Sequence, residues 1–238
     1  MKQSLIVVEG PDDLAALREL FDRCFGAQKG GAVAAREHAF RWKDAETRIL
    51  MANGKDKMPN LIAHRIRDLP SADWPFTQMG ICFDPDRHPD EQVLTWLRKN
   101  CKVEAPWNAD GMCQARVADM NLEIVALRWD LGPVFDQLKD LRNLERVALA
   151  VLAKTDPSEG KLIEELLEKV DSAKKPISWK TAFRLWAAIR YADSDPDTGG
   201  AMAHVFGQDQ ATRNALASVI EDSVFFSRLK RFAGAVPA

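Results

Sequence analysis

The chain has 238 residues, of which 46% are apolar and 29% are charged, as in an ordinary globular protein. This composition excludes a disordered tail, a collagen-like repeat and a low-complexity sequence. The 33 basic and 35 acidic residues leave a formal net charge of −2, which excludes a uniformly basic nucleic-acid binder. A local basic face is still compatible with this balance, because affinity depends on where the positive charges lie.

Cysteine spacing and hydropathy predict a cytoplasmic protein. The cysteines form no CxxC pair and no zinc-finger spacing with histidine, so we expect reduced, structural thiols. They are Cys24, Cys82, Cys101 and Cys113. The apolar run near the N-terminus is too short for a signal peptide, and no segment has the ~20 apolar residues of a membrane span. We therefore expect no membrane association.

The first 25 residues predict a strand followed by a helix. Ser4 to Val8 is a β-branched apolar run, typical of a buried strand in a parallel sheet. The strand ends at Glu9-Gly10-Pro11, where Gly10 is expected to permit a tight turn. The acidic pair Asp12 and Asp13 then opens a helix with apolar residues at helical spacing.

Two further strand–helix units follow. Residues 32–43 predict only extended or irregular chain. A strand over 47–52 precedes a helix over 58–69, and a strand over 79–83 precedes a helix over 90–100. Three such units in about a hundred residues predict a parallel sheet covered by helices.

Beyond residue 100 the pattern changes from alternating units to a hairpin and then helices. Strands are predicted over 114–119 and 122–129, with Met120-Asn121 as the turn. The predicted helices after Gly132 cover 134–153, 159–172, 178–191 and 209–233. The predicted fold class is α/β, a Rossmann-like parallel sheet with flanking helices (residues 1–130) and a mostly helical C-terminal part packed on it (131–238).

Four carboxylates follow the ends of two predicted strands: Glu9 and Asp13 after the first, Asp84 and Asp86 after the third. Ligands of open α/β sheets bind outside the carboxyl ends of the strands. Converging carboxylates repel each other unless protons or a divalent cation neutralise them, and Mg²⁺ prefers oxygen ligands. The alternative reading is structural, because acidic residues often cap helices and form turns.

The same segments resemble a known family. Residues 8–17 (VEGPDDLAAL) resemble the EGxxD motif of Toprim domains, and residues 81–87 (ICFDPDR) resemble their DxD motif. Residues 49–57 (ILMANGKDK) look like the second strand and glycine turn of that domain. The resemblance covers about residues 4–130. Its overall plan is similar to that of small stand-alone Toprim proteins related to the OLD (overcoming lysogenisation defect) nucleases.

The resemblance implies a site and an activity. Glu9, Asp13, Asp84 and Asp86 would bind Mg²⁺ or Mn²⁺, with Glu9 also able to act as general base in hydrolysis of DNA or RNA phosphodiesters. The related nucleases carry a lysine in an SxxK motif. Residues 178–180 (SWK) are one residue shorter than this motif, so Lys180 is a catalytic candidate that departs from the pattern.

Other residues allow further interpretations. Residues 174–190 contain five basic and no acidic residues, which suits either a phosphate-facing helix or a solvated surface. His88 follows the DxD segment and is either near a bound phosphate or in a surface turn. Two alternatives to a nuclease stay open: a Toprim scaffold that binds metal or nucleotide and docks an ATPase or another protein, and an enzyme acting on the phosphate of a free nucleotide.

Overall fold

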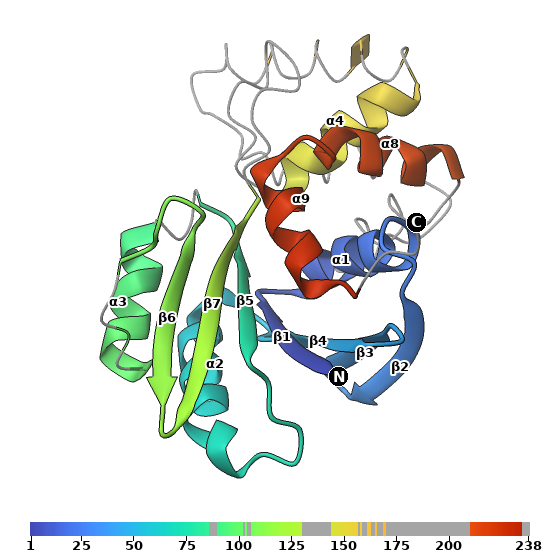
Figure 1. The fold of residues 1–238 in the computed structure, drawn as a ribbon. Helices are drawn as coiled ribbons and strands as arrows, with labels where there is room; N and C mark the ends of the chain where they lie inside the picture. The colour runs from blue at the N-terminus through green and yellow to red at the C-terminus, as the bar shows by residue number, and fades with distance from the viewer. Residues whose placement is uncertain are drawn as a thin grey trace.

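The computed structural model describes residues 1–85, 90–101, 103, 106–129, 144–156, 158, 161, 162, 165, 169 and 210–234. Within these residues a seven-stranded twisted sheet has helices on both faces (Figure 1). The predicted α/β, Rossmann-like fold is confirmed. None of the described helices has the length and apolar character that a membrane span requires.

The strands lie in the order β2-β3-β4-β1-β5-β7-β6. Their bounds are β1 Lys2–Val8, β2 Gln28–Ala34, β3 Glu37–Arg41, β4 Ala45–Met51, β5 Gln78–Phe83, β6 Met112–Val117 and β7 Met120–Arg128. The four central strands, β4, β1, β5 and β7, are parallel, whereas β2, β3 and β6 add antiparallel pairs at the two sides.

Helices separate into two layers by the sheet face that they cover. Their bounds are α1 Pro11–Arg23, α2 Met58–Asp68, α3 Asp90–Cys101, α4 Leu144–Thr155, α8 Gln210–Ile220 and α9 Val224–Leu229, with 3-10 turns η1 Lys55–Lys57, η2 Leu69–Ser71 and η4 Lys230–Phe232. Alternate residues of β1 enter the two cores, because successive strand side chains point to opposite faces. Ile6 and Val8 pack with α1, α4, α8 and α9, whereas Leu5 and Val7 pack with α2 and α3.

The described strands and helices of the predicted strand–helix units are confirmed within a few residues, but one local prediction is wrong. Within the segment 32–43, predicted only as extended or irregular chain, residues 32–34 belong to β2 and residues 37–41 to β3, and these strands pair with each other and continue the sheet beside β4. The hairpin turn between β6 and β7 lies at Ala118-Asp119 and not at Met120-Asn121, because Val117 pairs with Met120. Ala118 adopts a positive φ of 53°, which composition alone did not indicate.

The C-terminal helices are confirmed where the structure describes them. The predicted helix 209–233 is divided into α8 and α9 at Ser223, whose Oγ accepts a hydrogen bond from the Phe226 N–H at 3.0 Å and caps α9. Only the last part of the predicted helix 134–153 is described, as α4. The predicted helix 178–191, most of 159–172, and the residues Asp86, His88 and Lys180 lie outside the described residues.

Candidate functional site

The candidate site begins at the carboxyl ends of β1 and β5, which are neighbours in the sheet. These strands pair in parallel from Ser4 opposite Gln78 to Val7 opposite Ile81. Glu9 and Asp84 are the residues that directly follow the two strands. Parallel pairing in this register brings both residues to the same edge of the sheet, as the strand-end prediction required.

Asp13 lies in the first turn of α1 and is almost fully buried, with 9% of its surface exposed. Its Oδ2 accepts a hydrogen bond from the Gly10 backbone N–H at 3.0 Å, which satisfies one of the open donors at the start of the helix. Its Oδ1 accepts a second hydrogen bond from the Trp129 indole Nε1–H at 2.7 Å. Both carboxylate oxygens are therefore anchored by the protein itself.

Burial changes the acidity of this carboxyl. Desolvation is the largest cause that raises the pKa of Asp13 from 3.8 to about 7, and the negative charges of Glu9 and Asp12 raise it further. The hydrogen bonds from Trp129 and Gly10 act in the opposite direction, because they stabilise the charged form. Near neutral pH, Asp13 is divided between its protonated and ionised forms.

The thiol of Cys82 is sensitive to the three described carboxylates. This buried thiol on β5 has a pKa well above its usual value, first because of burial and then because of the negative charges of Asp13, Asp84 and Glu9. These influences agree with the register of β1 and β5, which brings Glu9 and Asp84 to the same edge of the sheet. Cys82 stays protonated there and is a packing group rather than a nucleophile.

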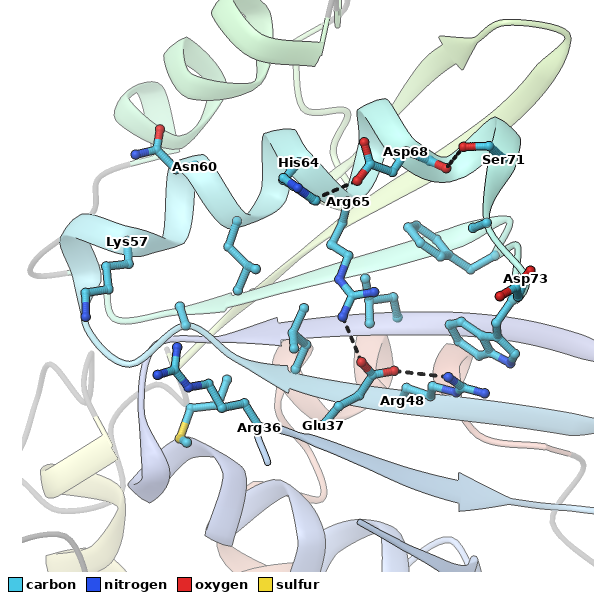
Figure 2. A pocket seen from close by; sticks show the side chains of 18 residues that line it. Arg36, Glu37, Arg48, Lys57, Asn60, His64, Arg65, Asp68, Ser71 and Asp73 are labelled. Atoms are coloured by element: carbon cyan, nitrogen blue, oxygen red, sulfur yellow. Dashed lines mark hydrogen bonds and ion pairs between the residues drawn. The ribbon is translucent and has the colours of Figure 1, made fainter. Parts of the chain in front are cut away.

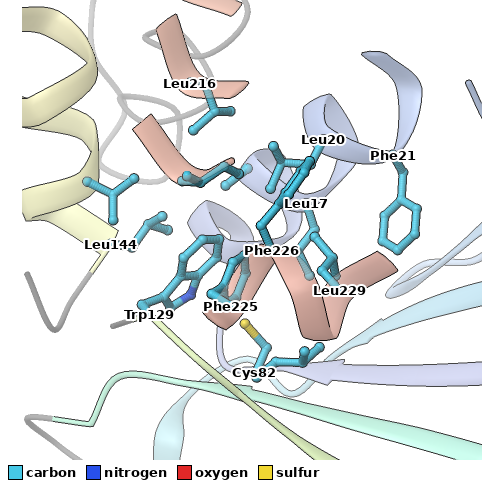
Figure 3. Close-up of a cluster of buried hydrophobic side chains, with 14 of the residues drawn as sticks. Leu17, Leu20, Phe21, Cys82, Trp129, Leu144, Leu216, Phe225, Phe226 and Leu229 are labelled. Atoms are coloured by element: carbon cyan, nitrogen blue, oxygen red, sulfur yellow. The ribbon is translucent and has the colours of Figure 1, made fainter. Parts of the chain in front are cut away.

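Asp84 joins the sheet to the C-terminal helices. It is 8% exposed, and its Oδ1 accepts a hydrogen bond from the Leu144 backbone N–H, at the described start of α4, at 3.3 Å. Figure 3 shows Leu144 and Trp129 on the same side of the buried cluster, with Cys82 below them. The carboxylate edge is thus closed on one side by residues that are distant in the sequence.

Trp129 is a site residue that the sequence analysis did not identify. It follows β7, the strand beside β5, and its backbone N–H donates to the Phe83 carbonyl oxygen at 3.2 Å. Its ring stacks on Phe225 of α9 with centroids 4.2 Å apart (Figure 3). Trp129 is the last residue of the predicted strand 122–129. This position places it at the same edge of the sheet as the predicted carboxylate site, and it could have identified Trp129 from the sequence.

The oxygen donors at this edge suit a hard divalent cation, although they do not form a complete ligand cage. Among the described residues, no group of three or more His, Cys, Asp or Glu side chains is arranged to hold a metal ion. Mg²⁺ typically uses one or two carboxylates and retains waters or phosphate oxygens as its other ligands. Glu9 and Asp84 supply the one or two carboxylates of this smaller requirement, and both oxygens of Asp13 accept hydrogen bonds, from Gly10 and from Trp129.

Gly10 was predicted to permit the turn after β1. Its φ of −149° is extended backbone that any residue adopts, so this turn does not require glycine for its conformation. Among the described residues, a Cβ at Gly10 would meet no atom within 4 Å, so these residues leave open space beside it.

No protein-family model matches the chain, and no curated protein matches it in sequence. Its structure is similar to the crystal structure of a hypothetical protein from Pyrococcus horikoshii OT3, with a TM-score of 0.67 and 17% sequence identity. The similarity covers 98% of this chain and 100% of the other. At this level of identity the comparison supports the fold, and the chemistry has to be argued from the residues of this chain.

Proposed function

We propose that this protein is a Toprim-like, Mg²⁺- or Mn²⁺-dependent phosphodiester hydrolase that acts on DNA or RNA. One observation carries the proposal: Glu9 and Asp84 directly follow the parallel, paired strands β1 and β5, and Asp13 accepts a hydrogen bond from the Gly10 N–H next to Glu9. The EGxxD and DxD resemblance supports the same assignment. Asp86 and Lys180 belong to the proposal from sequence alone.

The surroundings of each carboxylate determine the role that we propose for it. Glu9 and Asp84, with Asp86, would hold the cation, which would supply positive charge to neutralise the phosphate and lower the pKa of water. Asp13 is a positioning residue, because its hydrogen bond from the Gly10 N–H fixes the peptide that follows Glu9. An oxygen of Glu9 would accept a proton from the attacking water as the water oxygen bonds to phosphorus, and the leaving sugar oxygen would take a proton from solvent water as its own bond to phosphorus breaks.

The decisive variant is Asp84→Asn. The amide oxygen of Asn retains an acceptor for the Leu144 N–H, so we expect the fold to persist while the negative charge is lost. Cleavage of plasmid DNA or RNA should fall by about 100-fold or more, and calorimetric titration with Mg²⁺ or Mn²⁺ should show weaker binding.

The matched control is Asp119→Asn. Asp119 is exposed in the β6–β7 turn, at the opposite edge of the sheet, so its loss of charge should leave cleavage and metal binding unchanged. If a rigorously purified Asp84→Asn protein cleaved as well as the wild type, the proposed site would be refuted.

One observation favours a second candidate, a metal-binding scaffold that acts with a protein partner such as an ATPase. Asp13 accepts hydrogen bonds from Gly10 and Trp129, and Asp84 accepts one from Leu144. Such bonds are expected of carboxylates that stabilise the fold. Metal binding by the wild type without cleavage, together with co-purification of an ATPase, would support this scaffold. Metal-dependent cleavage by the isolated chain would exclude it.

A further inference from the structure

A second polar region lies on the other side of the sheet from Asp13. A pocket of about 860 Å³ is formed between α2 and the β3–β4 part of the sheet (Figure 2). Its apolar lining includes Leu5, Leu50, Ala52 and Phe76, all of which are buried. This volume is within the usual range of small-molecule sites, which combine an apolar lining with a few placed polar groups.

Buried carboxylates orient two arginines on the wall of this pocket. Glu37 is 5% exposed and lies between Arg48 and Arg65, with N···O distances of 3.2 Å and 2.7 Å (Figure 2). Arg48 also pairs with Glu46 at 2.8 Å, and its guanidinium lies 4.1 Å from the centre of the Trp74 ring. A guanidinium has five N–H donors, so these pairs fix its direction without using every donor.

The charges are distributed unevenly along the pocket. Arg36 and Lys57 line one end, and Asp73 lies at the opposite end (Figure 2). Both cations are exposed, and among the described residues neither side chain makes a hydrogen bond or ion pair. The end with Arg36 and Lys57 therefore presents positive charge that is available to an anion.

Backbone hydrogen bonds connect the positive end to the carboxylate edge. The Gly54 N–H donates to the Glu9 carbonyl oxygen at 3.0 Å, and the Lys57 N–H donates to the Gly54 carbonyl oxygen at 3.1 Å. On the other side, the Met51 N–H donates to the Arg36 carbonyl oxygen at 2.9 Å. Arg36 and Lys57 consequently lie on segments that are hydrogen-bonded to the end of β4 and, through Gly54, to Glu9 of the proposed hydrolytic site.

We propose that this pocket receives one nucleotide unit of single-stranded nucleic acid. Its phosphate would lie against Arg36 and Lys57, and its base would enter the apolar part of the pocket near Leu50. A single strand is favoured over a duplex, because flipping a paired base out of a duplex into a pocket costs free energy that an unpaired base does not require. This inference rests on the proposed function, since it names the substrate class of the neighbouring carboxylate site.

The test is fluorescence anisotropy with a short labelled single-stranded oligonucleotide, in EDTA so that cleavage does not interfere. The double substitution Arg36→Ala and Lys57→Ala should weaken binding about tenfold or more and reduce the slope of log affinity against log salt by about 1. An abasic oligonucleotide of the same length should bind the wild type more weakly than the normal one.

The control is the double substitution Arg18→Ala and Arg67→Ala, which removes two exposed cations from outside the pocket and gives the same change in net charge. It should bind the oligonucleotide as tightly as the wild type does. Equal binding by all three proteins, equal binding of the abasic strand, preference for a duplex, or binding of mononucleotides alone would each overturn the inference.

Asp84→Asn separates this inference from the proposed function, because it removes charge from the carboxylate edge and leaves the pocket intact. If oligonucleotide binding depends on Arg36 and Lys57 but the wild type has no metal-dependent cleavage, only the hydrolase proposal fails. If cleavage depends on Asp84 but binding is unaffected by the pocket substitutions, only the pocket inference fails.

Discussion

Asp13 combines features of a structural acid and of a site residue. Its two hydrogen bonds, to Gly10 and Trp129, fix α1 against the end of β1 and against β7. Its burial favours the protonated form, whereas those hydrogen bonds favour the charged form. The balance places its pKa at about 7, so its protonation responds to conditions near neutrality.

Asp13→Asn should therefore change how stability depends on pH. Between the ordinary pKa of 3.8 and the folded value of about 7, the folded state retains a proton that the unfolded state has released. Raising pH through this window favours unfolding, by at most on the order of 1 kcal/mol per pH unit. Urea unfolding at a series of pH values should show a smaller decline for Asp13→Asn than for the wild type. Identical pH profiles would contradict the burial argument.

At the scale of elements, the packing of the C-terminal turn η4 against the central strand β5 depends on one small residue, Gly80. A Cβ at Gly80 would lie 2.8 Å from Leu127 Cδ1 and 2.9 Å from Phe232 Cζ. The missing side chain allows the C-terminal turn η4 to lie close to the sheet, next to the strand that carries Cys82 and leads to Asp84. Close packing of this kind leaves no space for an added methyl group.

Gly80→Ala should lower the free energy of unfolding by about 1–3 kcal/mol, because the new methyl group displaces well-packed neighbours. Gly10→Ala is the matched control, since a Cβ there meets no atom of the described residues within 4 Å and the backbone is extended. Chemical denaturation should place the control within about 0.5 kcal/mol of the wild type. Equal stability of all three proteins would show that the packing at Gly80 is more tolerant than these contacts indicate.

For the whole molecule, the C-terminal helices are part of the main core. Leu144 and Val147 of α4, Leu216 of α8, and Phe225 and Leu229 of α9 belong to the same buried cluster as α1 and the sheet. Fully burying an apolar side chain of this size contributes roughly 1.5–3 kcal/mol. Because Trp129 and Asp84 contact α9 and α4, these helices also shape the carboxylate edge.

A chain that ends at Trp129 should fail to fold cooperatively. It would expose the face of α1 and the sheet that α4, α8 and α9 cover, and Trp129 would lose its stacking on Phe225. We expect a broad thermal transition by circular dichroism and strong binding of the dye ANS. A sharp transition without dye binding would instead show that residues 1–129 fold independently.

The sequence by itself predicted the features that depend on local pattern. The β-branched run of β1, the helical spacing after Asp12 and the strand ending at Phe83 each repeat over a few residues, so their positions follow from periodicity. Placing Glu9, Asp13 and Asp84 at one edge then required only the rule for the carboxyl ends of parallel strands. In the structure Glu9 and Asp84 follow the paired strands β1 and β5, and Asp13 is hydrogen-bonded to the Gly10 N–H next to Glu9.

Tertiary structure alone decided the contacts between distant segments. Trp129 reaches Asp13 across 116 residues, and Glu37 of β3 meets Arg65 of α2 across 28. Strand β3 is specified by pairing with β4 and strand β2 by pairing with β3, and the pocket beside α2 exists only when these elements pack together. Hydrophobic periodicity identifies which face of an element is buried, but the partner of that face is chosen by the packing of the whole chain.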